Sequence, residues 1–297
     1  MRKLGWITFA ALVFGLIGIW LIGSLLSRPT PSVIAAAASP AQDVWIKTGD
    51  GLDIAGTYRP GNSLSAPGIL LLHGNGASRA ATDSNAAWLT EQGFATLTID
   101  FRGHGESDVS DHSFGLFEAR DARAAFDWLG KRQGGARIGV IGISLGGAAA
   151  LLGDEGPLPA DALVLQAVYP DIRAAIRNRL AERLGGVLAT LGEPLLSYQS
   201  WLRQGVGPDR LSPLAAMPMA KAPVLVIGGA DDVYTPEAET RALFAAAGGP
   251  KEMWIVPGLG HAAMSDANTQ AYRARVGAFF ARVLKVEMRS PSSSEEG

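Results

Sequence analysis

The feature that most constrains the fold is a serine between glycines, at the point where a buried strand turns into a helix. The apolar run Arg137–Ile141 precedes the segment Gly142–Gly147, which reads GISLGG, and small residues follow from Ala148. Such a turn holds one residue in a strained conformation, and the glycines let the backbone reverse without a clash. The Ser144 hydroxyl should then lie exposed at a helix N-terminus, where the helix dipole favours negative charge. The pattern predicts acyl transfer through a serine ester.

A serine hydroxyl needs a general base, and the chain has four histidines. His73 ends an apolar strand, His104 lies in a glycine-rich turn and His112 lies in a polar loop. His261 follows the apolar strand Met253–Val256 on a glycine-containing loop. Because an open α/β sheet carries its chemistry on loops after strand ends, we predict that His261 is the base.

The acid that orients the histidine should follow another strand end, between the serine and the histidine in the chain. The buried strand Pro223–Gly228 is followed by two adjacent aspartates, Asp231 and Asp232. Neighbouring loop residues point in different directions, so only one of the two can face the imidazole. The residues alone leave both candidates open.

Two backbone N–H groups should stabilise the oxyanion of the tetrahedral intermediate. The first is expected from Leu145, directly after the serine. The second is expected from the main chain of Asn75, in the glycine-rich loop after the strand Gly68–His73. A phosphate-binding function of this loop is disfavoured, since it lacks G-x-x-x-x-G-K-[ST] and Arg79 stands where a dinucleotide fingerprint has its third glycine.

Five segments together resemble the α/β-hydrolase superfamily, over about residues 43–285. In chain order they are His73–Gly76, Asp100–Ser107, Gly142–Gly147, Gly229–Asp232 and Gly258–His261. Within the superfamily the chain is similar to the membrane-anchored, serine aminopeptidase-like and Bem46-like hydrolases.

The resemblance implies the α/β-hydrolase fold, a Ser–His–Asp triad, and neither metal nor cofactor. Its spacing G-x-x-D-x-x-x-P, which runs from Gly229 to Pro236, favours Asp232 over Asp231 as the acid. The expected triad is therefore Ser144, Asp232 and His261. The fold hosts esterases, lipases, thioesterases, amidases and peptidases, so the resemblance does not identify the substrate.

A second group of the matching residues is predicted to be structural. The segment Asp100–Asp108 follows a strand, and we expect Asp100 and Arg102 to pair with each other in a buried corner beside the site.

The N-terminus predicts a membrane helix. Leu4–Leu26 is a stretch of 23 residues without a charge, about 35 Å as a helix, which is enough to cross a bilayer. Residues 27–42 are expected to form a tether. We favour an uncleaved anchor over a cleaved signal sequence, although small residues at 33–39 offer cleavage sites, because signal cores are usually shorter.

Charges flanking this helix predict its orientation. Arg2 and Lys3 precede it and only Arg28 follows closely, so the remainder of the chain is expected on the periplasmic or extracellular side. The alternatives are secretion after cleavage and, less favoured, a cytoplasmic domain.

Strand-like and helix-like segments alternate after the tether, which predicts a mostly parallel central sheet with helices on both faces. The alternation stops between about residues 171 and 215, where we expect a small helical cap over Ser144. An apolar stripe recurs there at helical spacing, and each member is expected in the core more often than in an acyl pocket: Leu180, Leu184, Val187, Leu188, Leu191 and Leu195. Residues 286–297 are expected to be a disordered tail.

Composition narrows the function. The net charge of −2 and the lack of a basic stripe argue against nucleic acid as a partner, and the absence of cysteine excludes a thiolate nucleophile or a cysteine-ligated zinc. We therefore expect a serine hydrolase acting on a small-molecule carboxylic ester or thioester. An amidase or aminopeptidase is the alternative, with Asp171, Glu182 or Glu193 holding a substrate amino group; a non-catalytic, membrane-tethered binding protein is a remote third.

Overall fold

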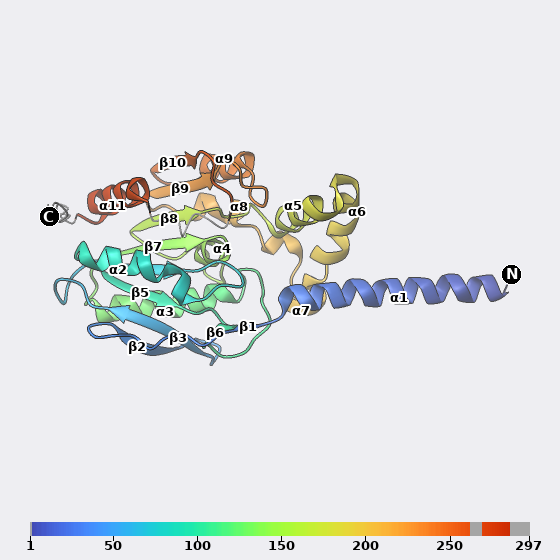
Figure 1. Ribbon diagram of the computed structural model, residues 1–297, viewed down its shortest axis with the longest axis horizontal. Helices are drawn as coiled ribbons and strands as arrows, with labels where there is room; N and C mark the ends of the chain where they lie inside the picture. Colours follow the sequence, from blue (N-terminus) through green and yellow to red (C-terminus); the bar gives the residue numbers. More distant parts are fainter. Residues whose placement is uncertain (1, 262–268, 286–297) are drawn as a thin grey trace, which may run out of the picture.

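A single large sheet carries the fold, in a computed structural model that describes residues 2–261 and 269–285 (Figure 1). Its eight strands have the order β10-β9-β8-β7-β4-β5-β3-β2. Six neighbouring strands run parallel: β4 (Gly68–Leu72), β5 (Ala95–Ile99), β7 (Ile138–Ile143), β8 (Ala162–Gln166), β9 (Val224–Gly229) and β10 (Lys251–Val256). At one side of the sheet, β3 (Asp53–Arg59) pairs antiparallel with β5, and the edge strand β2 (Gln42–Lys47) pairs antiparallel with β3. The predicted mostly parallel sheet is confirmed.

Helices cover both faces of this sheet, as predicted. One face is covered by α3 (Glu118–Arg132), α4 (Leu145–Leu151) and α9 (Glu237–Ala246), and the other by α2 (Asp83–Glu91) and α11 (Gln270–Leu284). Every residue of β4, β5, β7, β8 and β9 is buried. Strands covered on both faces are buried throughout, and β4, β7, β8 and β9 are accordingly runs of mostly apolar residues, whereas β5 (ATLTI) buries two threonines as well.

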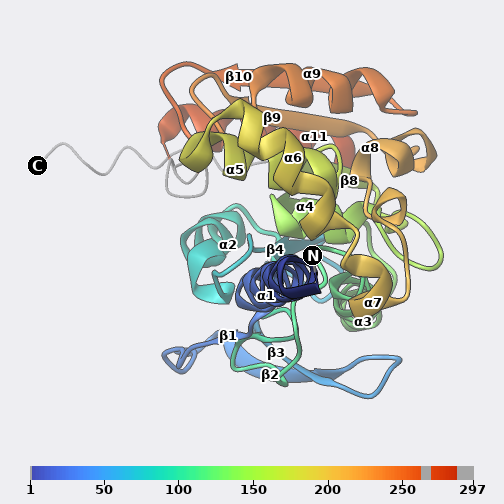
Figure 2. The same ribbon diagram turned by 90° about the vertical axis from the view of Figure 1, so that its right-hand side faces the viewer.

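Three helices interrupt the alternation between β8 and β9. They are α5 (Ile172–Leu184), α6 (Gly186–Ser197) and α7 (Ser200–Gln204), and we call them the cap helices. Short helical turns lead from them back to the sheet: η2 (Pro208–Arg210), α8 (Pro213–Ala216) and η3 (Met217–Met219). The cap helices lie on the same side of the sheet as the N-terminal helix, beyond the carboxyl ends of the parallel strands (Figures 1 and 2).

The N-terminal helix α1 (Arg2–Ser27) extends away from the sheet and passes the cap helices with its last turns (Figure 1). Its segment Phe9–Ser27 is long and apolar enough to cross a membrane. The strand β1 (Thr30–Pro31) then pairs with β6 (His104–Gly105) and fixes the start of the tether on the domain. The predicted tail at 286–297 lies outside the described residues, and the predicted helix at 262–285 is described only from Gln270.

The expectation that the apolar stripe of the cap lies in the core is wrong. The stripe is divided between two helices, because the chain turns at Gly185 with φ at 80°. Leu180 lines a pocket, whereas the other members are exposed: Leu184, Val187, Leu188, Leu191 and Leu195. Helical periodicity predicts an apolar face correctly, but it does not say what covers that face.

The predicted ion pair between Asp100 and Arg102 is also wrong. Both side chains are buried, but Asp100 pairs with Arg79, and Arg102 pairs with Asp121 at 2.7 Å and Asp50 at 2.8 Å. Arg79 lies in the short helical turn η1 (Arg79–Thr82) that precedes α2, Asp121 lies in α3, and Asp50 lies in the turn between β2 and β3. Asp100 and Arg102 lie two residues apart on the loop, and each pairs with residues of other elements.

Replacing Arg102 should destabilise the fold strongly. Arg102→Leu leaves the fully buried Asp121 without its counter-ion, which should cost about 3–5 kcal/mol of unfolding free energy. Arg123→Leu, on the helix α3 that carries Asp121, is the matched control. Its partners Asp127 and Glu155 are exposed, and such pairs contribute at most about 1 kcal/mol. Urea unfolding followed by tryptophan fluorescence measures both. Equal losses in the two variants would contradict the assigned role of Arg102.

Candidate active site

Ser144 lies at a strained turn between β7 and α4. Its φ is 49° and its ψ is −108°, a conformation that residues with side chains rarely adopt. The glycines around it are required by space, since a Cβ on Gly146 would lie 2.2 Å from the Leu72 carbonyl oxygen and one on Gly147 would lie 2.2 Å from a Val168 methyl. The Ser144 N–H donates to the Gln166 carbonyl at 2.8 Å. The backbone therefore holds the hydroxyl beyond the sheet edge.

An aspartate from the loop after β9 and a histidine from the loop after β10 reach this serine. His261 Nε2 lies 3.2 Å from Ser144 Oγ, and His261 Nδ1 lies 2.8 Å from Asp232 Oδ2. Asp232 is buried, and its other oxygen accepts the N–H groups of Tyr234 at 2.9 Å and Thr235 at 2.8 Å. The aspartate is thus oriented by the backbone, and the histidine is oriented by the aspartate.

The two aspartates left open by the residues have different environments. Asp231 is exposed, and its backbone N–H donates to the Leu259 carbonyl. Asp232 is the one whose carboxylate meets His261. The spacing that favours Asp232 therefore agrees with the geometry.

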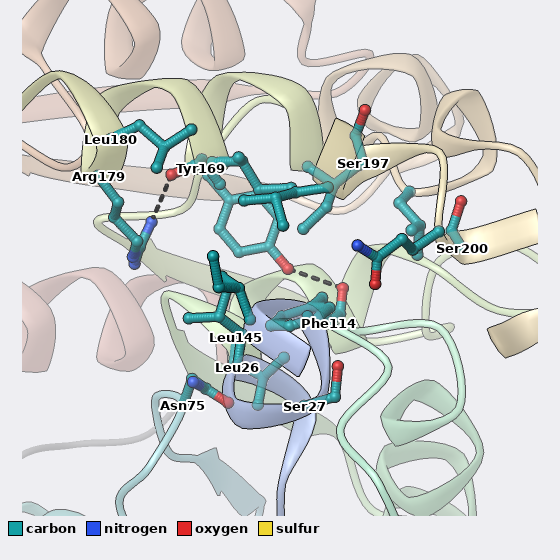
Figure 3. Close-up of a pocket in the computed structure, with 18 of the residues that line it drawn as sticks. Leu26, Ser27, Asn75, Phe114, Leu145, Tyr169, Arg179, Leu180, Ser197 and Ser200 are labelled. Carbon is teal, nitrogen blue, oxygen red and sulfur yellow. Dashed lines mark hydrogen bonds between the residues drawn. The ribbon is translucent and has the colours of Figure 1, made fainter. Parts of the chain in front are cut away.

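The candidate oxyanion donors lie on either side of the serine. Leu145 is the first residue of α4, and the first-turn N–H groups of a helix have no partner within it. Asn75 lines the same pocket as Ser144 and Leu145 (Figure 3). A Cβ on the preceding residue, Gly74, would lie 3.8 Å from Ser144 Cβ, so this loop passes close to Ser144.

Two buried histidines hold the Asn75 loop. His73 Nε2 accepts the Phe101 N–H at 3.1 Å, and His104 Nε2 accepts the Gly76 N–H at 3.1 Å. Their Nδ1 atoms lie 2.7 Å from the Gly74 carbonyl and 3.0 Å from the Arg102 carbonyl. Each ring thus donates through Nδ1 and accepts through Nε2, which requires the neutral form.

Burial keeps these rings neutral. Desolvation, together with a smaller effect of the neighbouring histidines, lowers the pKa of His73 to about 4 and that of His104 to about 3. His112 continues the row, stacked on His104 with centroids 3.8 Å apart. The sequence patterns indicate no role for these three histidines. His73 and His104 belong to the H-G-N-G and R-G-H-G segments that match the family, but only the fold brings these histidines close to each other.

An apolar pocket of about 370 Å³ opens over Ser144. Its lining comes from the domain and the cap helices, and includes the apolar side chains of Phe114, Leu145, Tyr169, Ile172, Ile176, Leu180, Leu196 and Leu211. The Tyr169 hydroxyl already donates its hydrogen bond to the Phe114 carbonyl at 2.8 Å (Figure 3), so it has no donor left for a molecule in the pocket. The pocket can accept an apolar chain that ends at the serine.

Arg179 brings a positive charge into this pocket. One of its guanidinium nitrogens donates to the Ala175 carbonyl at 3.0 Å, and the guanidinium lies 5.1 Å from the Tyr234 ring centroid. Among the described residues, no carboxylate lies within salt-bridge distance of it. Burial lowers the pKa of the Arg179 guanidinium, because it makes the charged form less favourable. An anionic group bound in the pocket would therefore stabilise the charge on Arg179 and would itself be stabilised by it.

Helix α1 forms part of the same wall, which the sequence did not indicate. Ile22, Gly23, Leu26 and Ser27 line the pocket together with the cap helices.

Among residues 2–261 and 269–285, no group of three or more His, Asp or Glu side chains could hold a metal ion.

The model of the alpha/beta hydrolase family matches residues 69–275. The chain belongs to this family. The matched segment contains Ser144, Asp232 and His261, and it includes the cap helices.

Relatives within the family are of several kinds. An uncharacterized protein of Mycobacterium tuberculosis is 34% identical over 237 residues, which cover 78% of this chain and 76% of the relative. The lysophosphatidylserine lipase ABHD12 of Danio rerio is 32% identical over 128 residues, which cover 41% of this chain and 33% of the lipase. The structure of a Pyrococcus furiosus esterase has the same fold, with a TM-score of 0.68 at 22% identity, over 86% of this chain and 98% of the esterase.

The neutral histidines under the Asn75 loop should make stability depend on pH. As the pH falls, the histidines of the unfolded chain bind protons before those of the folded chain. The contribution of the neutral rings to the free energy of unfolding is therefore complete above the unfolded pKa of about 6.5, and it is lost as the pH falls towards the lower pKa values of the folded state. Between pH 7.5 and 5.5 each should cost about 1.4 kcal/mol of unfolding free energy. Chemical unfolding at the two pH values measures this.

His104→Gln is the control for this loss. A glutamine can accept the Gly76 N–H but does not titrate, so the pH-dependent loss should be smaller by about 1.4 kcal/mol. The same pH dependence in this variant and in the wild type would show that His104 is not held neutral.

Proposed function

We propose that this protein is a serine hydrolase that cleaves carboxylic ester or thioester bonds through an acyl-enzyme. The observation that carries the proposal is the hydrogen-bonded series Ser144, His261 and Asp232, with distances of 3.2 Å and 2.8 Å. A serine without such a base is a weak nucleophile at neutral pH.

Each residue has one role in this mechanism. Ser144 Oγ attacks the carbonyl carbon while its proton passes to His261 Nε2, and Asp232 stabilises the imidazolium through Nδ1. The N–H groups of Leu145 and Asn75 donate to the oxyanion. His261 then protonates the departing alcohol or thiol. In the second half, water attacks the acyl-serine with His261 as its base, and the acid and Ser144 are released.

The pocket favours an ester over a peptide. An aminopeptidase needs a carboxylate for the substrate amino group, and the described pocket lining contains arginines but no acid. Of the acids expected to serve, Glu193 is buried against Arg173 and Arg177, and Asp171 caps α5 through the Ala174 N–H. The names of the esterase and lipase relatives agree with ester cleavage. Amidase or aminopeptidase activity is the alternative, and a non-catalytic binding protein is remote.

Helix α1 is proposed to anchor the enzyme in a membrane, with the catalytic domain on the periplasmic or extracellular side. Its length and apolar composition support this. Its contribution to the pocket wall favours retention, because cleavage of a signal sequence would remove Ile22, Leu26 and their neighbours from the site. Secretion after cleavage is the alternative, and N-terminal sequencing of the mature protein distinguishes the two.

Ser144→Ala should abolish turnover without unfolding the protein. The test is fluorophosphonate labelling of the full chain, beside hydrolysis of short- and long-chain nitrophenyl esters and of an aminoacyl anilide. We expect labelling at Ser144, ester turnover in the wild type, and loss of both in the variant, with an unchanged circular dichroism spectrum. Ester turnover that survives in Ser144→Ala would refute the mechanism, whereas turnover of the anilide alone would favour the peptidase.

Arg179 should select substrates that carry an anionic group. A charge-assisted hydrogen bond contributes about 1.5–3 kcal/mol, so Arg179→Gln should raise KM for a phosphate- or carboxylate-bearing acyl ester by roughly tenfold or more. A neutral ester of the same acyl length is the control, and its KM should change little. Equal effects on both substrates would mean that Arg179 only supports the pocket wall.

A further inference from the structure

An apolar surface lies on the outside of the cap helices, apart from the pocket. We call it the cap ridge; it consists of the exposed apolar side chains within residues 184–202, none of which lines the pocket. Its large apolar side chains are exposed by 49–80%, and they include Val187, Leu188, Leu191, Trp201 and Leu202. So many large apolar side chains exposed within one short stretch of chain are unusual for a surface in contact with water and are typical of a docking site.

The charges around the ridge fit a lipid surface. Residues 184–202 contain one acid, Glu193, and it is buried and bonded to Arg173, Arg177 and Ser197. The ridge therefore presents no carboxylate. Arg183, with a side chain 77% exposed, lies just before it, and Arg203 lies just after it. Apolar side chains bordered by arginines suit the boundary between acyl chains and phosphate headgroups.

The ridge is continuous with the helix that is proposed to span the membrane. Gln199 Nε2 donates to the Ile19 carbonyl at 3.0 Å, and Arg203 donates to the Trp20 carbonyl and to Ser24 Oγ, each at 2.9 Å. The Arg203 guanidinium also lies 3.9 Å from the Trp20 ring centroid. Figure 2, which looks along α1, shows α6 and α7 on the side of the molecule from which α1 extends.

The position along α1 sets the depth of the ridge. About 20 residues of helix cross a hydrocarbon core of about 30 Å, and the apolar span of α1 ends at Ser27. The contacts at Ile19, Trp20 and Ser24 therefore lie on the last turns of that span, on the side where α1 leaves the hydrocarbon core. A tryptophan stacked under an arginine is suited to that depth.

We propose that the cap ridge is a membrane-docking surface, which lies in the boundary layer of the same bilayer that α1 spans. The proposal rests on the membrane anchor of the proposed function. The pocket over Ser144 is lined by α1 and by the helices that carry the ridge. With the ridge in the bilayer, the pocket opens toward lipid, and an acyl substrate enters from the membrane without crossing bulk water.

The absence of native cysteine allows a direct test on the full chain. Leu191→Cys and Trp201→Cys place a nitrobenzoxadiazole fluorophore on the ridge. Phe14→Cys places it within α1, and Leu64→Cys, at a side chain 93% exposed before β4, places it at the opposite edge of the sheet from Ser144. The labelled proteins are reconstituted in phosphatidylcholine–phosphatidylglycerol vesicles. Quenching by nitroxide-labelled lipid is compared with quenching by aqueous iodide.

The ridge labels should behave like the Phe14 label, quenched by lipid nitroxide and shielded from iodide, while the Leu64 label should respond to iodide alone. If the ridge labels respond like Leu64 while Phe14 is in lipid, the docking surface is refuted and the anchor stands. If Phe14 also responds to iodide, the anchor itself is wrong and the ridge proposal falls with it. Ridge labels shielded from both quenchers would identify a protein cover, such as a second copy, and would overturn the lipid assignment.

A charged variant tests the consequence for turnover. Leu188→Glu combined with Leu191→Glu should lower turnover of esters embedded in vesicles about tenfold and leave that of a short soluble ester unchanged, because neither residue lines the pocket. Leu64→Glu, the matched control, should change neither rate. Unchanged turnover of embedded esters in the double variant would contradict lipid entry at the ridge.

Discussion

Close packing of backbone around Ser144 is the constraint on which the rest of the site depends. The turn works because Gly146 lies against the Leu72 carbonyl and Gly147 against Val168, which brings α4 down onto three strands. A serine at φ 49° carries strain of about 1–3 kcal/mol, and the buried helix and sheet around it supply the compensation. The hydroxyl is therefore directed by the backbone, and the loops after β9 and β10 have only to deliver one side chain each.

Local patterns predicted the parts of the molecule that local physics determines. Apolar runs buried on both faces identified the parallel strands, and the glycines around Ser144 identified the turn because nothing else fits there. The order of the strand ends along the chain then predicted His261 as the base, and the family spacing predicted Asp232 as the acid. These residues are far apart in the chain, but parallel strands end at one edge of a sheet, so the fold class alone brings them near one another.

Contacts between distant elements could not be predicted in the same way. Arg102 finds Asp121 on α3, a partner that no spacing along the loop indicates. The buried histidines beneath the Asn75 loop, and the end of α1 in the pocket wall, likewise depend on how loops and helices meet in space. The exposed leucines of the cap show the same limit, because the period of an apolar face does not distinguish protein from lipid as its cover.

The end of α1 in the pocket wall links location to selectivity. An N-terminal helix of this kind is usually treated as an exchangeable part, yet here Ile22 and Leu26 line the pocket over Ser144. Grafting a different anchor, or expressing the domain from residue 42 onward, would reshape that space even if the domain folds as before. A change in α1 would then alter which substrates the pocket accepts, even where the change lies far in sequence from Ser144.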